Sequence, residues 1–426
     1  FASVPFFTRA LELDPEFALA HARLGTVYSN LGEQDQARTH TSRAYELRDK
    51  VSERERYYID ARYYSSVERD VDRAIEAYRL WKTTYPGDFT PYVNLGGLHR
   101  GRGETAEAIQ NLEEAVRLAP DEPLARLNLG FAYLDDDRFA DARASFEAVL
   151  ALVENTSARS GLLTIGVITG DDALVDAQVE AARGRRDEVD LLATRAAGAL
   201  YQGRLARARA LYDDVRARLR DLGRLEKTGE GVIGAAIGFA LAGDHTTARA
   251  LMAEAREGGM VGDDTADEEV VLGMLLGDGG LATAALPRVE ALLGDGPTAQ
   301  ADRRLMRAMS LGSQGQWARA IEEMGTPTME RRNTRHIFVY ALASLRAGAW
   351  DEAARGARWL LEQREALELS PARAYAHVVL ARAHASAGRV ADARAAYEAL
   401  FEFWKSADAD TPLLVEARAE YARLGT

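Results

Sequence analysis

The sequence predicts an all-α fold, a solenoid of about eleven antiparallel helix pairs with a leading orphan helix and a C-terminal capping helix. Three observations predict it. Small residues recur with a 34-residue period in the first third of the chain, and further along glycines recur five residues before a small residue. The composition, 47% hydrophobic and 28% charged over 426 residues, is that of an ordinary folded protein.

The period is clearest in the second helix of each expected pair. Ala10 and Ala44 lie 34 residues apart in matching contexts, and so do Trp81 and Ala115. The step from Ala44 to Trp81 is 37 residues, which indicates a three-residue extension around residues 50–56. A period of this length is typical of repeats built from two helices, each pair stacking on the next.

Each repeat predicts two helices whose axes approach to about 8 Å. Small residues on both helices allow this approach, a glycine in the left-handed region ends the first helix, and a proline ends the second. The residues are Gly25, Gly96, Gly130, Ala37, Ala108 and Ala142 for the contact, Gly32 and Gly103 for the turn, and Pro15, Pro86 and Pro120 for the end.

Beyond about residue 156 a reduced pattern remains, a glycine turn followed five residues later by a small residue. One more pair is expected to turn near Gly170 and another near Gly279, where Pro287 falls in a second helix that should be continuous. The recurring pairs are Gly203 with Ala208, Gly243 with Ala248, Gly315 with Ala320, Gly348 with Ala353, and Gly388 with Ala393.

The repeats divide the chain into five expected parts. Residues 1–16 match the second helix of a truncated repeat, so the chain is expected to be a piece of a longer protein. Thr411 and Pro412 form a good N-cap and first-turn pair for a last helix. The other parts are well-formed repeats at 17–155, degenerate helix pairs at 156–300, further pairs at 301–410 and the capping helix at 411–426.

Composition excludes several classes of function. The net charge is −13, and no long basic run is present, which argues against nucleic-acid binding by phosphate neutralisation. The absence of cysteine excludes disulfides, thiolate nucleophiles and cysteine-bound metals. The longest uncharged stretch, residues 231–243, is too short for a membrane-spanning helix.

Three candidate motifs have simpler explanations. Gly229, Gly231 and Gly234 satisfy a dinucleotide-binding spacing, but the preceding residues are charged and helical in character, so small-residue helix packing is the preferred explanation. His377 and His384 share a helix face but lack a third ligand for zinc. The acidic residues at 263–269 lack the spacing of a calcium loop and suit the start of a helix.

The repeats resemble the tetratricopeptide repeat superfamily. The Leu-Gly pair of its pattern is met at Leu24–Gly25, Leu95–Gly96 and Leu129–Gly130, and the residues that follow are Tyr28, His99 and Tyr133 and then Ala37, Ala108 and Ala142. The repeat containing Ala61 and Arg62 has lost the Leu-Gly pair. The resemblance implies a right-handed superhelical solenoid whose first helices line a concave groove. It covers most of the chain, closely to about residue 155 and loosely thereafter.

A narrower resemblance is to the repeat regions that follow the kinase domain and membrane segment of some bacterial serine/threonine protein kinases. It implies a sensor or docking region in a larger signalling protein. No kinase motif is present in this chain. The passages that carry the resemblance are residues 46–64, 74–96 and 395–424.

The groove offers candidate peptide-binding residues. Asn94 and Asn128 are 34 residues apart, each directly before a Leu-Gly pair, so they project from the same position of successive repeats. An asparagine carries one acceptor and two donors, enough to pair with the backbone of an extended peptide. Arg23 and Asp60 take this position in the two earlier repeats. The alternative stays open, because asparagine is also common here in repeats with no known ligand.

Two classes of function follow. The first is a non-catalytic scaffold that binds a peptide or protein in its groove, with no catalytic residue, metal, cofactor, nucleic acid or inserted membrane segment. The second is a module that senses a small ligand in a pocket of the central repeats, as in a transcriptional regulator or a stand-alone repeat protein. The kinase resemblance implies an extracytoplasmic location, and otherwise a cytoplasmic one is expected. The carboxylate clamp of chaperone-binding relatives is not matched, so chaperone tails are not expected to bind.

Overall fold

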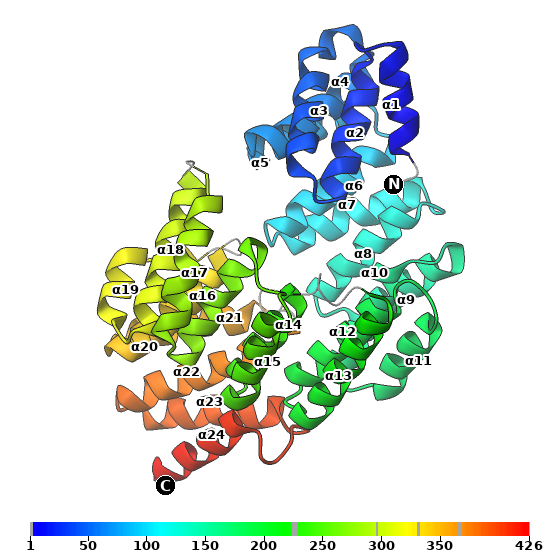
Figure 1. Cartoon of the computed structure of the whole chain (residues 1–426). Helices are drawn as coiled ribbons and strands as arrows, with labels where there is room; N and C mark the ends of the chain where they lie inside the picture. The colour runs from blue at the N-terminus through cyan, green and yellow to red at the C-terminus, as the bar shows by residue number, and fades with distance from the viewer. Residues whose placement is uncertain (1–2, 224–228, 295–296, 330–332, 364–368, 426) are drawn as a thin grey trace. The chain divides into compact units, whose positions relative to one another are not determined.

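The structure is a computed structural model of the chain and describes all residues except 1–2, 224–228, 295–296, 330–332, 364–368 and 426. The described residues form 24 α-helices and no strand (Figure 1). They divide into two compact units, Phe1–Gly161 and Leu162–Thr426. The all-α prediction is confirmed, because one leading helix is followed by eleven consecutive helix pairs and a final helix.

In the first unit each helix from α1 to α8 packs against the next one along the chain. The unit ends inside α10, six residues beyond the expected end of the well-formed repeats at residue 155. Its helices are α1 Val4–Leu13, α2 Ala18–Asn30, α3 Gln34–Glu46, α4 Glu53–Tyr63, α5 Val71–Thr84, α6 Phe89–Gly101, α7 Thr105–Leu118, α8 Pro123–Asp135, α9 Phe139–Leu152 and α10 Thr156–Thr169.

The close contacts between paired helices occur at the expected small residues. A Cβ atom added to Gly96 on α6 would lie 2.4 Å from the Cγ of Leu112 on α7, and one on Gly130 would lie 2.6 Å from the ring of Phe146. Ala108 and Ala142 on the second helices are fully buried. Larger residues at these positions would force the paired helices apart.

The extension in the second repeat lies mainly at a different place from the expected one. The two helices of the α4–α5 pair start 18 residues apart, against 16 in the pairs on either side. The extra residues form a π-helical turn, Tyr64–Glu68, that continues α4. Only one extra residue lies near residues 50–56, beside a 3-10 turn at Arg48–Lys50. Sequence spacing counts inserted residues but cannot say which end of a helix absorbs them.

The second unit continues the pairing. A 3-10 turn at Asp263–Thr265 leads into α16. The helices are α11 Asp172–Ala182, α12 Glu188–Tyr201, α13 Leu205–Asp221, α14 Gly229–Leu241, α15 His245–Glu257, α16 Ala266–Leu276, α17 Gly279–Leu292, α18 Pro297–Ser313, α19 Trp317–Met324, α20 Thr334–Ala347, α21 Trp350–Glu362, α22 Ala372–Ser386, α23 Val390–Phe403 and α24 Pro412–Arg423.

Glycine turns recur through this unit as the sequence predicts. A glycine with positive φ precedes each of α11, α13, α15, α19, α21 and α23. Five of these glycines are followed, five residues later, by a fully buried alanine, namely Ala208, Ala248, Ala320, Ala353 and Ala393. Gly277 makes the corresponding turn before α17. The helix α17 runs through Pro287, where an interruption was expected, although proline can donate no backbone hydrogen bond there.

The last helix does more than cap the array. Leu413 and Leu414 of α24 belong to one buried core with residues of α14, and the Leu413 amide donates to the carbonyl of Ala242 at 3.1 Å. The Thr411 hydroxyl does not cap α24, as its sequence position predicted, but donates to the buried carbonyl of Gly203 at 2.9 Å. The C-terminal end of this unit therefore packs against its first helices.

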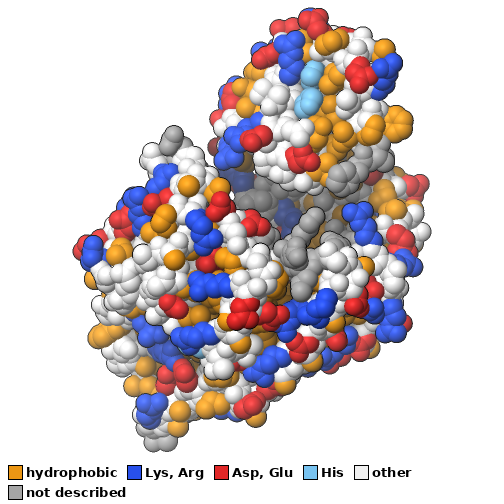
Figure 2. All heavy atoms as spheres, in the orientation of Figure 1, with side chains coloured by type: hydrophobic (Ala, Val, Ile, Leu, Met, Phe, Trp, Pro, Cys, Tyr) orange, Lys and Arg blue, Asp and Glu red, His pale blue; other side chains and the backbone are white. Residues whose placement is uncertain are grey.

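Charges of both signs are spread over the visible face of each unit, with lysine and arginine interspersed among aspartate and glutamate (Figure 2). Mixed charge of this kind offers no extended basic surface on that face for a nucleic-acid backbone. Across the described part of the chain, every helix falls short of the length and apolar character needed to span a bilayer.

Candidate functional site

The structure brings Asn94 and Asn128 together in one cavity of the first unit. This Asn94–Asn128 cavity has a volume of about 240 Å³. It is bounded by α4, its π-helical turn, α5, α6 and α8. The lining residues are Arg62, Ser65, Tyr78, Val93, Asn94, Gly97, Leu98, Leu124 and Asn128.

Local sequence fixes the helices that carry these side chains. Asp88 caps α6 by accepting from the Thr90 amide at 3.0 Å, and Arg54 and Trp81 also donate to its carboxylate, at 2.6 and 3.1 Å. Burial alone would raise the pKa of Asp88, but the hydrogen bonds from Arg54 and Thr90, with that of Arg54 first, hold it below its usual value. The start of α8 has Pro123 in its first turn.

The two asparagines differ in how much hydrogen-bonding capacity they leave open. Asn94 donates one amide hydrogen to the carbonyl of Thr90 at 2.8 Å, which leaves one donor and the acceptor oxygen. Asn128 makes no side-chain hydrogen bond with any described residue. Both side chains are partly exposed. A peptide backbone group could therefore pair with either amide without displacing an existing tertiary contact.

The structure places Arg23 and Asp60 outside this cavity. The guanidinium of Arg23 lies over the Tyr58 ring, 4.8 Å from its centroid. Asp60 forms ion pairs with Arg48 at 3.5 Å and Arg56 at 3.8 Å. Burial raises the pKa of Asp60 against the influence of these two arginines. The four sequence candidates therefore do not form one continuous row.

Arg62 and Ser65 line the cavity although they were not among the sequence candidates. Arg62 occupies the position that glycine holds in the neighbouring repeats, and Ser65 belongs to the π-helical turn. The Ser65 hydroxyl donates to the carbonyl of Arg62 at 3.1 Å. Burial raises the pKa of Tyr78, and the positive charge of Arg62 acts in the opposite direction. The replacement of the Leu-Gly pair by Ala61 and Arg62 was the feature of the sequence that could have pointed to Arg62.

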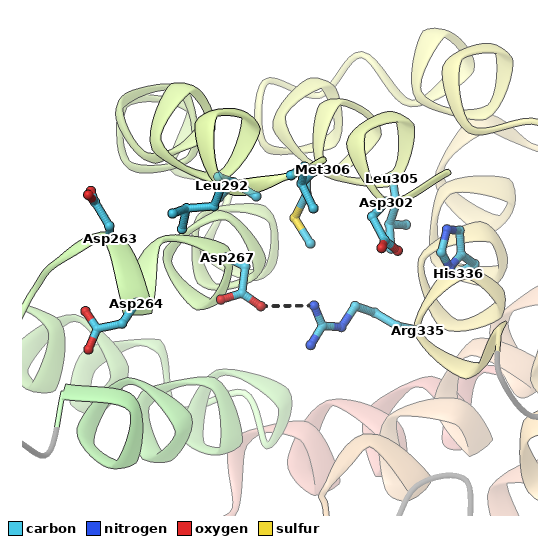
Figure 3. A pocket seen from close by; sticks show the side chains of 11 residues that line it. Asp263, Asp264, Asp267, Leu292, Asp302, Leu305, Met306, Arg335 and His336 are labelled. Atoms are coloured by element: carbon cyan, nitrogen blue, oxygen red, sulfur yellow. Dashed lines mark hydrogen bonds and ion pairs between the residues drawn. The ribbon is translucent and has the colours of Figure 1, made fainter. Parts of the chain in front are cut away.

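A second cavity, of about 400 Å³, lies in the second unit and is termed the acidic cavity (Figure 3). Arg335 pairs across it with Asp267 at 3.2 Å. The lining combines four carboxylates with apolar side chains, namely Asp263, Asp264, Asp267, Asp302, Val289, Leu292, Leu293, Leu305 and Met306, together with Arg335 and His336. Its carboxylates outnumber its one arginine, which favours a cationic ligand over an anionic one.

The acidic segment behaves as expected for the start of a helix, because Asp267, Glu268 and Glu269 stand in the first turn of α16. Glu269 is buried and accepts from Arg288 at 2.5 Å. Among the described residues, no group of three or more histidine, aspartate or glutamate side chains is arranged to hold a metal ion.

The remaining motifs are placed as follows. The ring of His377 lies 6.0 Å from that of Phe403, and His384 accepts from Arg389 at 2.8 Å. A Cβ atom on Gly229 would meet the Met260 carbonyl, whereas one on Gly231 or Gly234 would meet nothing within 4 Å. Small-residue packing therefore explains only the first glycine of that motif. The segment directly before it, residues 224–228, lies outside the described residues.

Two stretches of the sequence match family models described as tetratricopeptide repeat, residues 99–164 and residues 6–39. These two stretches are similar to tetratricopeptide repeats. Solenoids of stacked helical repeats present extended concave surfaces that can bind partners. No curated protein matches the sequence.

Several solved structures are similar to this chain over part of its length or more. TTC0263, a thermophilic TPR protein of Thermus thermophilus, is 26% identical with a TM-score of 0.37, covering 43% of this chain and 99% of that one. The TPR domain of P58(IPK) is 16% identical with a TM-score of 0.25, covering 88% and 98%. The APC/C hetero-tetramer Cut9–Hcn1 is 14% identical with a TM-score of 0.34, covering 97% and 92%.

Proposed function

We propose that the chain binds an extended peptide, or an extended segment of a partner protein, across α4, α6 and α8. The observation that carries the proposal is that Asn94 and Asn128, one repeat apart, line the same cavity and keep open hydrogen-bonding groups. Backbone recognition through amide side chains tolerates many peptide sequences, because every residue offers the same backbone groups.

The spacing of the helices suits an extended ligand. Packed helices lie about 8–10 Å apart, and an extended chain advances about 3.3 Å per residue. The contact between α6 and α8 therefore places the two asparagines roughly three peptide residues apart. Val93, Leu98 and Leu124 add apolar surface beside them, which suits a ligand with at least one apolar side chain.

Selected peptides test the proposal. A phage-displayed library of random 12-residue peptides is selected on the full chain, and the affinity of the enriched peptides is measured by fluorescence polarisation. The double variant Asn94→Ala with Asn128→Ala should weaken binding at least tenfold, because it removes both amides. Gly97→Leu should also weaken it, because a Cβ at Gly97 meets nothing within 4 Å and the longer side chain would fill the cavity.

The matched control is Asn30→Ala, which removes an exposed asparagine at the end of α2, outside the cavity. Circular dichroism melting shows whether each variant is folded. Enriched peptides that bind the double variant as tightly as the wild type would contradict the proposal, and so would a selection that yields no binder.

The narrower part of the proposal is that this scaffold is the sensor or docking region of a larger bacterial signalling protein such as a serine/threonine kinase. Its support is the resemblance of residues 46–64, 74–96 and 395–424. The gene sequence upstream of the codon for Phe1 tests it. A kinase domain there supports the assignment, and a DNA-binding domain there contradicts it.

The acidic cavity favours a second candidate function, the sensing of a small cationic ligand by the second unit. Its carboxylates and apolar side chains would suit an organic amine, since the amine pairs with the former and its carbon chain contacts the latter. Spermidine is a suitable probe. It should raise the melting temperature of the wild type and have no effect on Asp264→Asn with Asp302→Asn; an equal effect on both would contradict this candidate.

A further inference from the structure

Arg62 brings a positive charge into the Asn94–Asn128 cavity that no described carboxylate neutralises. Its Nε atom is buried and has no hydrogen-bond partner. Arg62 is also the only charged residue among the nine that line the cavity. A partly buried guanidinium without an acceptor is costly, because it loses hydration and gains nothing in return.

The other arginines of these repeats show how unusual this is. Arg54, on the same helix, donates to Asp88 at 2.6 Å, and Arg100 on α6 donates to Asp135 at 2.6 Å. In the turn between α6 and α7, beside a neighbouring hollow lined mainly by α5, Arg102 pairs with Glu104 at 2.9 Å. Each of these arginines has its own carboxylate within the chain, whereas Arg62 has none among the described residues.

The local fold explains how an arginine reaches this place. Position 62 corresponds to Gly96 and Gly130, where a Cβ atom would collide with the paired helix. The α4–α5 pair, which holds the arginine, also differs from its neighbours in that the π-helical turn at Tyr64–Glu68 lengthens it by two residues. π-Helical turns occur often at functional sites. The same turn supplies Ser65 to the cavity wall.

We propose that the Asn94–Asn128 cavity binds a carboxylate of the extended peptide, with Arg62 as its ionic partner. The inference deepens the proposed function and rests on it. A planar guanidinium matches a carboxylate through two parallel hydrogen bonds. The single positive charge balances one carboxylate and would leave a phosphate dianion undercompensated. Asn94 and Asn128 then hold the peptide backbone while Val93, Leu98 and Leu124 contact its neighbouring side chain.

The carboxylate can come from an aspartate or glutamate side chain or from the C-terminus of the peptide. Two changes to a selected peptide distinguish these sources, replacement of its acidic residue by the corresponding amide and amidation of its C-terminus. One of the two changes should weaken binding to the wild-type chain at least tenfold. Because these changes leave the protein untouched, they test the inference even where a variant of Arg62 is destabilised.

The test on the protein side is Arg62→Gln. This variant should bind the unmodified peptide at least tenfold more weakly than the wild type does. Removing the peptide carboxylate should then weaken its binding no further. Arg62→Lys keeps the charge but cannot donate two parallel hydrogen bonds to a carboxylate, so it should recover binding only in part. The matched control is Arg79→Gln, which removes an exposed arginine of α5 outside the cavity.

The outcomes separate the two levels of the proposal. If Asn94→Ala with Asn128→Ala abolishes binding while neither peptide change nor Arg62→Gln has an effect, the carboxylate inference is overturned and the peptide-binding function stands. If no peptide binds, the peptide-binding function and the carboxylate inference are both overturned. Dependence on the peptide carboxylate that disappears in Arg62→Gln establishes the ion pair.

Discussion

The indole N–H of Trp404 donates to the backbone carbonyl of Tyr201 at 2.8 Å, although 203 residues separate them in the chain. Trp404 is 1% exposed, and its ring also lies against Gly203, where a Cβ atom would come within about 3.1 Å of it. This contact joins the end of α23 to the end of α12. It makes the second unit close upon itself, so that its stability depends on both of its ends.

Trp404→Ala should therefore destabilise the second unit by about 3–5 kcal/mol, because it leaves a large cavity in a packed core. Trp404→Phe should cost less, because it retains most of the packing. Its remaining cost, about 1–3 kcal/mol, comes from leaving the Tyr201 carbonyl without its donor. Urea unfolding followed by circular dichroism measures both. Trp350→Ala, at a site 41% exposed, is the control and should change the free energy of unfolding by less than about 0.5 kcal/mol.

Two adjacent glycines of α6 should respond in opposite ways to alanine. Gly96→Ala places a methyl group against fully buried Leu112 and should destabilise the first unit by about 1–3 kcal/mol. Gly97→Ala meets nothing within 4 Å and should stabilise the helix by about 0.4–1 kcal/mol. Thermal melts of the two variants provide the comparison. Equal effects of the two substitutions would mean that Gly96 does not pack against Leu112.

Much of this fold could be predicted because its determinants are local and repeat. Ala37, Ala108 and Ala142 recur at fixed intervals, and each is buried where the period places it. The turn between α8 and α9 shows a limit, since Asp137 adopts a positive φ of 58° there without glycine. The closure of the second unit was missed for another reason. The residues that meet are about 200 positions apart, and no periodic signal links them.

The candidate site could be predicted only where the repeats are regular. Asn94 and Asn128 share a cavity because their repeats have the same length. Extending the row to Asp60 assumed that the α4–α5 pair is as regular as its neighbours, but a π-helical turn follows α4 in this pair. Asp60 pairs with Arg48 and Arg56 outside the cavity, and Arg62, two residues further along α4, lines it instead. An irregular repeat has to be located in space before its residues can be aligned.

Acid should destabilise the second unit through His377. Burial lowers the pKa of His377 to about 4, and the positive charge of Arg373 acts in the same direction. Between about pH 6.5 and pH 4 the unfolded chain therefore binds a proton that the folded chain does not. The stabilisation is present above pH 6.5 and is lost as the pH falls, by about 3 kcal/mol in total.

Replacing the histidine by a group that does not titrate should remove this dependence. The free energy of unfolding of His377→Leu, measured by urea at pH 7 and at pH 5, should fall by about 2 kcal/mol less than that of the wild type over the same interval. Identical pH dependence in the two proteins would show that His377 is not the buried group responsible.

The register of the repeats themselves is tested by an arginine scan across α9. Ala142 is fully buried at the contact between paired helices, and Ala140, two residues earlier on the same helix, is exposed. Ala142→Arg should destabilise the first unit by at least about 3 kcal/mol, because the guanidinium must either be buried without a partner or push the helices apart. Ala140→Arg should change the free energy of unfolding by no more than about 0.5 kcal/mol. Since both variants add the same charge to the same helix, a difference in their melting temperatures reports only which face is buried. Equal melting temperatures would place the small residues of the 34-residue period away from the helix contact and remove the basis for aligning Asn94 with Asn128.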